Sequence, residues 1–263
     1  MTQITKPTVS LAALAAVFAL AATANAATSV SINITNDDVD THQVNSDETA
    51  TSLFTGANWN NVAVRTDGLS ATIATPINQS LTDSTGASGA ATITGNNLPA
   101  GDGFVENSGA ANATTGTQGL MGAYLAFGGT TAGNSNETIT ISGLGGDFAA
   151  GYDVYLYFDI LTARTYGFTI GSQTFFTNDG SGTGNYALAS PTWTRATGTT
   201  SGTATANANY ALFTGLSGSS FTISGAATPR SVLSGIQIVA VPEPSAAALL
   251  GGLGMLALLR RRR

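Results

Sequence analysis

Short stretches of alternating apolar and polar residues run through most of the chain and predict β-strands. In Thr28–Thr35 every second residue is apolar, and shorter alternating stretches follow at Thr138–Ile141 and Phe221–Ser224. Leu233–Val241 is the last of these stretches, with Ile236 and Ile238 two residues apart. Such alternation places one face of each strand in a core and directs the other face away from it.

A β-hairpin is predicted where Tyr166–Ile170 and Gln173–Phe176 are separated only by Gly171-Ser172. Glycine at the first turn position accepts the positive φ of a type II′ turn. No stretch of the chain sustains the periodicity of an amphipathic helix. About ten strands without helices between them predict an all-β domain, an antiparallel two-sheet sandwich of jelly-roll type.

The pattern is weakest over Ser80–Gly119, where Ala, Gly, Ser, Thr and Asn dominate. This segment forms either long surface loops or a boundary between two smaller lobes. We favour one sandwich with a loose middle, because neither half alone supplies enough strands for an independent core. The predicted β-sandwich domain covers residues 27–241.

The N-terminal residues have the pattern of a secretory signal peptide. Lys6 supplies a positive start, Val9–Ala22 is almost wholly apolar, and Ala24-Asn25-Ala26 offers small residues for cleavage by signal peptidase. We therefore assign residues 1–26 to a signal peptide, so that the exported chain begins at Ala27. A buried N-terminal helix is the alternative, but it does not explain the small residues at the cleavage position.

The C-terminal residues combine a proline-rich triplet, an apolar run and a basic end. Pro242-Glu243-Pro244 is followed by the apolar Ala246–Leu259, about 21 Å long as a helix. A bilayer core is about 30 Å thick, so the run needs its flanking residues to complete a span. The chain then ends in a cluster that predicts a membrane stop on the cytoplasmic side: Arg260, Arg261, Arg262 and Arg263.

Taken with the signal peptide, this order of parts in residues 242–263 resembles the PEP-CTERM sorting signal of Gram-negative bacterial surface proteins. The resemblance does not extend to the domain upstream. It implies processing by an exosortase near Pro242-Glu243-Pro244, transient anchoring in the inner membrane, and a final place at the cell surface or in the extracellular matrix. The alternative is an ordinary C-terminal anchor in which Pro242 and Pro244 keep the linker extended.

The charge of residues 27–241 is strongly negative. This segment holds four arginines, no lysine and fourteen carboxylates, which gives a formal net charge of −10. Such a surface repels the phosphates of nucleic acids, so we expect no nucleic-acid partner. The chain has no cysteine, which excludes disulfides, a thiolate metal site and a cysteine nucleophile.

One loop concentrates carboxylates close to the single histidine, His42. Oxygen clusters of this kind hold calcium, although the spacing departs from that of an EF-hand. His42 itself lacks the motif context of a catalytic triad or a zinc site. The loop is therefore either a solvated charged segment or a calcium site whose candidate ligands are Asp37, Asp38 and Asp40, with Asp47 and Glu48 nearby.

Tyr152–Ile160 (YDVYLYFDI) is the most informative stretch of the domain. One face carries Tyr152 and four other apolar residues and is expected in the core. The opposite face presents two phenols and two carboxylates, a combination that suits carbohydrate binding: Asp153, Tyr155, Tyr157 and Asp159. Tyrosines on a strand also follow from β-propensity and cross-strand packing alone.

The two tryptophans, Trp59 and Trp193, are surrounded by small polar residues. Each either exposes a face for ligand stacking or is buried at a core or an edge, as tryptophan is on average.

We interpret the chain as an exported surface or matrix protein with a structural or adhesive role. It recognises exopolysaccharide, and calcium is the one cofactor that we consider. In this interpretation the chain is not an enzyme. There are two alternatives: a secreted polysaccharide hydrolase, and a passive spacer without a ligand.

Overall fold

The protein is described here by a computed structural model. The described residues are 27–35, 53, 58–63, 77–96, 103–105, 120, 123–127, 138–158, 164–178, 193–226 and 231–242. The chain divides into two units. One is Thr28–Val241, which contains every described strand; the other comprises Met1–Ala27 and Pro242–Arg263, of which only Ala27 and Pro242 belong to the described residues.

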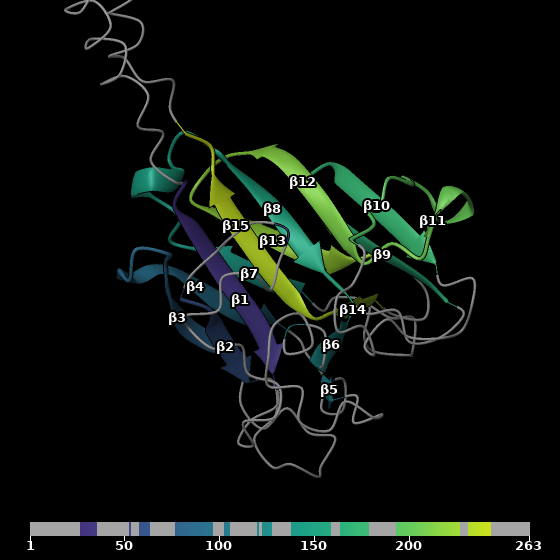
Figure 1. Ribbon diagram of the computed structural model, residues 1–263, viewed down its shortest axis with the longest axis horizontal. Coiled ribbons are helices and arrows are strands. Elements are labelled where there is room, and N and C mark those ends of the chain that lie inside the picture. The colour runs from purple at the N-terminus through teal and green to yellow at the C-terminus, as the bar shows by residue number, and fades with distance from the viewer. Residues whose placement is uncertain are drawn as a thin grey trace, which may run out of the picture. The chain divides into compact units, whose positions relative to one another are not determined.

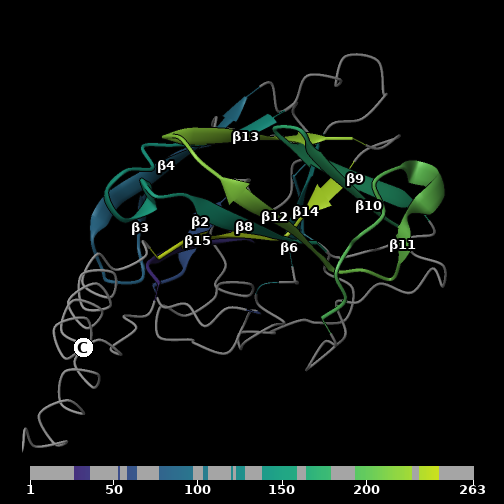
Figure 2. The same cartoon turned by 90° about the horizontal axis from the view of Figure 1, so that it is seen from above.

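The described elements are β-strands in three sheets, together with two short 3-10 helices, η1 (Gly146–Phe148) and η3 (Ser201–Thr203). Figures 1 and 2 show the two larger sheets as facing layers. The five-stranded sheet has the order β12 (Tyr210–Leu216), β8 (Tyr152–Tyr157), β15 (Gly235–Ala240), β1 (Ser29–Thr35) and β2 (Asn60–Ala63). This arrangement confirms the all-β, sandwich-like class predicted from the alternation.

The second layer is a seven-stranded sheet. Its order is β11 (Thr205–Ala206), β10 (Gln173–Asn178), β9 (Thr165–Ile170), β13 (Ser220–Gly225), β7 (Thr138–Ser142), β4 (Ser88–Asn96) and β3 (Asn78–Thr82). A third, three-stranded sheet contains β14 (Ser231–Leu233), β6 (Ala123–Phe127) and β5 (Gly103–Val105). The expected loose middle is thus partly wrong, because β3 and β4 are regular members of the larger sheet.

Two strand pairs depart from the antiparallel arrangement that the sequence predicts. β1 pairs with β2 in parallel, and so does β10 with β11. Parallel neighbours need a connection of about a dozen residues or more. Residues 36–59 separate β1 from β2 and residues 179–204 separate β10 from β11, so both connections are long enough.

The main core lies between the two larger sheets. Inward-facing side chains from the five-stranded sheet, such as Ile32 and Ile238, belong to the same apolar cluster as Ile93 and Ile141 from the seven-stranded sheet. All four are completely buried. Burial of apolar area is the dominant favourable contribution to folding, so this cluster is what holds the two layers together.

The second face of the five-stranded sheet is polar and buried at β1 and β15. Ser29, Ser31, Asn33 and Gln237 lie there at 0% exposure. The side chain of Gln237 donates from Nε2 to Ser31 Oγ at 3.0 Å, so part of this face is satisfied by cross-strand hydrogen bonds. Burial of polar groups is tolerated when such bonds are made.

Candidate functional site

β8 places its two faces in different surroundings. Tyr152, Val154 and Leu156, together with Phe158 just beyond the strand, are fully buried in the main core. This confirms the apolar face that the alternation predicts. The opposite face carries Asp153 and Tyr155, which are partly exposed, and Tyr157.

The prediction that Tyr157 is available to a ligand is wrong. Its side chain is 0% exposed, and its hydroxyl donates to Gln237 Oε1 at 2.9 Å. The ring of Trp193 packs against it edge-on, with centroids 5.2 Å apart. Alternation along one strand cannot reveal that Trp59, Leu120 and Trp193 pack at this end of the face, so Tyr157 is a structural residue.

We predict that Tyr157→Phe lowers the free energy of unfolding by about 0.5–1.5 kcal/mol, because the buried hydrogen bond from its hydroxyl to Gln237 Oε1 is lost. Tyr155→Phe is the matched control, since Tyr155 lies on the same strand face and is partly exposed. Urea unfolding of both variants measures the difference. Equal stability of the two variants would contradict the assigned role of the Tyr157 hydroxyl.

Three partly exposed rings form what we call the aromatic surface: Tyr155 of β8, Tyr210 of β12 and Trp193. Tyr155 and Tyr210 are stacked, with centroids 6.4 Å apart and an interplanar angle of 28°. Trp193 meets Tyr210 edge-on at 6.4 Å and 85°. The pairing of β12 with β8 brings these rings together from segments far apart in the sequence.

Two charged side chains lie beside the aromatic surface and fix the edge strand β12. Asp153 Oδ1 accepts a hydrogen bond from Gly215 N at 3.0 Å, and Arg195 donates from Nη2 to Leu212 O at 3.1 Å. Burial raises the pKa of Tyr155; Asp153 and Tyr210 add to the rise, and Arg195 opposes it. The phenol therefore stays protonated at neutral pH and keeps its donor.

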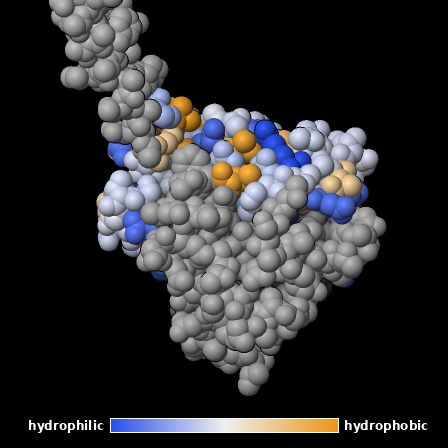
Figure 3. Space-filling model, in the orientation of Figure 1, coloured by the Kyte–Doolittle hydropathy of each residue, from blue (hydrophilic) through white to orange (hydrophobic). Residues whose placement is uncertain are grey.

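The described surface in the orientation of Figure 1 is largely hydrophilic, with small hydrophobic areas between polar ones (Figure 3).

Trp59 does not contribute a ring to the aromatic surface. Its side chain is only 5% exposed and packs with Leu120 and Tyr157. For Trp59 the buried alternative is confirmed, whereas Trp193 retains partial exposure. Asp159 lies outside the described residues.

The expected calcium ligands Asp37, Asp38 and Asp40 also lie outside the described residues. Across the described ranges, no three His, Cys, Asp or Glu side chains come together as a metal-binding group. Of the sorting triplet, Pro242 is described and exposed, while Glu243, Pro244 and the cluster of Arg260, Arg261, Arg262 and Arg263 are not described. No helix in the described part of the chain is long and apolar enough to cross a membrane.

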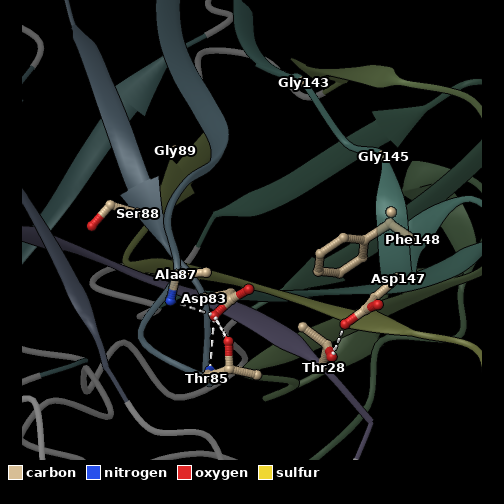
Figure 4. Close-up of a pocket in the computed structure, with 11 residues that line it drawn as sticks. Thr28, Asp83, Thr85, Ala87, Ser88, Gly89, Gly143, Gly145, Asp147 and Phe148 are labelled. Carbon is tan, nitrogen blue, oxygen red and sulfur yellow. Dashed lines mark hydrogen bonds between the residues drawn. The ribbon is translucent and has the colours of Figure 1, made fainter.

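A second feature, which the sequence did not predict, is a hollow of about 460 Å³. It is formed by Thr28, by the turn between β3 and β4, and by the segment from β7 to η1 (Figure 4). Its lining combines two carboxylates, three hydroxyls, one phenyl ring and several glycines: Thr28, Asp83, Thr85, Ala87, Ser88, Gly89, Gly143, Gly145, Gly146, Asp147 and Phe148.

Asp83 is held firmly by its own turn. Its Oδ1 accepts hydrogen bonds from Thr85 N at 2.8 Å, Thr85 Oγ1 at 2.6 Å and Ala87 N at 3.0 Å. On the opposite wall, Thr28 Oγ1 donates to Asp147 Oδ2 at 2.5 Å. In the sequence, these residues belong to an Asp-Ser-Thr turn and to a distant Gly-rich segment with one Asp. Only the fold places the two segments around the same hollow.

The chain was compared with protein-family models, with curated proteins and with solved structures. None of the three comparisons found a match for this chain, so its function has to be inferred from its own residues.

Proposed function

We propose that the chain is an exported protein of the bacterial surface or extracellular matrix, with a structural or adhesive role. The support is the signal peptide pattern in residues 1–26 and the PEP-CTERM-like order of residues 242–263. In this proposal an exosortase cuts near Pro242-Glu243-Pro244 after the apolar segment has held the chain in the inner membrane. The intervening domain is a jelly-roll-like sandwich.

We further propose that the domain binds polysaccharide through the aromatic surface. The observation that carries this proposal is the group of three contiguous, partly exposed rings, Tyr155, Tyr210 and Trp193. Aromatic faces pack against the apolar side of a sugar ring, and Tyr hydroxyls and the Trp N–H supply polar contacts at the ring edge. Exopolysaccharide made by the same bacterium is the proposed ligand.

The experiment measures binding of residues 27–241 to this exopolysaccharide, with and without calcium. This segment is suitable because every described strand belongs to the unit Thr28–Val241. The test variant is Tyr155→Ala/Tyr210→Ala. The matched control is Thr140→Ala/Thr222→Ala, which changes two neighbouring side chains on β7 and β13 of the other sheet, whose hydroxyl oxygens are 3.1 Å apart.

We expect saturable binding that the tyrosine variant weakens at least tenfold, about 1.4 kcal/mol, and that the threonine variant leaves unchanged. A requirement for calcium would direct attention to Asp37, Asp38 and Asp40. Release of reducing sugar ends during the assay would favour the hydrolase instead. Absence of binding in both conditions would reject the carbohydrate proposal and leave a passive spacer.

A further inference from the structure

The described lining of the hollow carries negative charge. It includes Asp83 and Asp147, and none of its described residues is Lys, Arg or His. The rest of the domain offers little compensation, because residues 27–241 have a net charge of −10 and no lysine. The electrostatic potential of the hollow therefore attracts cations and repels anions.

Asp83 leaves one carboxylate oxygen without a partner. The side chain is only 7% exposed, and its three hydrogen bonds all go to Oδ1. Oδ2 accepts no hydrogen bond from a described residue, and in Figure 4 this oxygen is directed across the hollow toward Phe148. Oδ2 therefore faces the hollow as a fixed, charged acceptor for an incoming donor.

The size and lining of the hollow suit a sugar ring rather than a bare ion. A volume of about 460 Å³ lies in the range of small-molecule pockets, and hydroxyls of Thr28, Thr85 and Ser88 line it. A Cβ built at Gly89 or at Gly146 meets no atom within 4 Å, so these two lining glycines border open space. A metal ion would need several converging oxygens, and the described residues bring no third carboxylate here.

We propose that the hollow binds a sugar residue carrying a free primary ammonium group, as found in a deacetylated amino-sugar polysaccharide. The ammonium pairs with Asp83 Oδ2, the charge of Asp147 on the opposite wall adds to the attraction, and the ring hydroxyls exchange hydrogen bonds with the threonine and serine hydroxyls. A neutral sugar leaves both carboxylates without a charged partner and binds more weakly. This inference rests on the proposed polysaccharide binding and names its substrate class.

The experiment compares two soluble oligosaccharides of equal length, a glucosamine oligomer and its fully N-acetylated counterpart. Calorimetric titration of residues 27–241 is carried out at low salt, at a pH where the amine is protonated. The principal variant is Asp147→Asn, because Asp147 is exposed and its replacement leaves the core untouched. The control is Arg164→Gln, which makes the domain more negative by one charge at an exposed residue that does not line the hollow.

A second variant, Asp83→Asn, keeps an Oδ1 acceptor for Thr85 and Ala87 and replaces Oδ2 by an amide donor. Thermal melts check that both hollow variants stay folded. We expect the glucosamine oligomer to bind at least tenfold more tightly than the N-acetylated one. Asp147→Asn and Asp83→Asn each weaken that binding at least tenfold, while Arg164→Gln changes it less than twofold.

Equal affinity for the two oligomers would overturn the inference. A gain in affinity in Arg164→Gln as large as the loss in Asp147→Asn would also overturn it, because it would indicate general charge attraction. Binding lost only in Tyr155→Ala/Tyr210→Ala would leave the aromatic surface as the site and overturn the hollow. Glucosamine binding at the hollow without any effect of the tyrosine variant would support this inference and reject the aromatic surface.

Discussion

Replacing Phe168 by alanine is expected to lower the free energy of unfolding by about 3–5 kcal/mol. Phe168 is 1% exposed in the main core, and its ring stacks on Phe158 with centroids 4.9 Å apart at 24°. The variant loses buried apolar area, the aromatic pair and the filled volume together. Domains are stable by about 5–15 kcal/mol in total, so this change removes a large share.

Urea unfolding followed by circular dichroism measures this loss as a lower midpoint with an unchanged slope. Phe168→Leu is the graded control, because leucine keeps most of the apolar volume and gives up only the ring stacking. We expect its cost to be less than half that of alanine. If alanine at Phe168 costs under about 1 kcal/mol, the site does not belong to a close-packed core.

Gly198→Ala is expected to cost about 3 kcal/mol, at the upper end of the usual cost of overpacking. A Cβ at this position would lie 2.0 Å from Thr203 O and 2.9 Å from Ala204 Cα. These are backbone atoms, so no side-chain rotation relieves the overlap. Gly198 O also accepts a 2.7 Å hydrogen bond from Phe176 N, which ties this segment to β10 and limits its movement.

The matched control for Gly198→Ala is Gly202→Ala in η3, where an added Cβ meets nothing within 4 Å. Neither glycine has a positive φ, so the two variants differ in steric overlap and not in backbone preference. Gly202→Ala is expected to change stability by no more than about 0.5 kcal/mol. Thermal melts of the pair provide the measurement, and similar melting temperatures would show that the segment at Gly198 moves aside at little cost.

The strands that sequence alone predicted best are those with local signatures. The hairpin predicted around Gly171-Ser172 corresponds to β9 and β10, and Gly171 has φ +57° as the turn requires. Leu233–Val241, by contrast, was predicted as one strand and is interrupted at Ser234, with β14 and β15 in different sheets. Alternation continues through such a break, so it cannot show a change of sheet.

The candidate sites were predictable only where one strand carried the pattern. The alternating pattern of β8 predicted Tyr155 as a candidate site residue. It did not predict its partner Tyr210, which belongs to the neighbouring strand β12. The buried polar face of Ser31 and Gln237 was likewise hidden, because a strand covered on both sides can keep a half-polar sequence when its polar groups bond across strands. The hollow was not predictable because the residues that line it, such as Asp83 and Asp147, come from segments some 60 residues apart.

The way the chain leaves the domain determines how the domain responds to mechanical tension. β15 is a central strand, bonded to β8 on one side and to β1 on the other, and Val241 N donates to Gly151 O immediately after it. Antiparallel hydrogen bonds run perpendicular to the strands, so a pull at Val241 along β15 shears both ladders together. Bonds loaded together resist force better than bonds opened one after another, so a domain tethered through its C-terminal end would bear load at one of its strongest points.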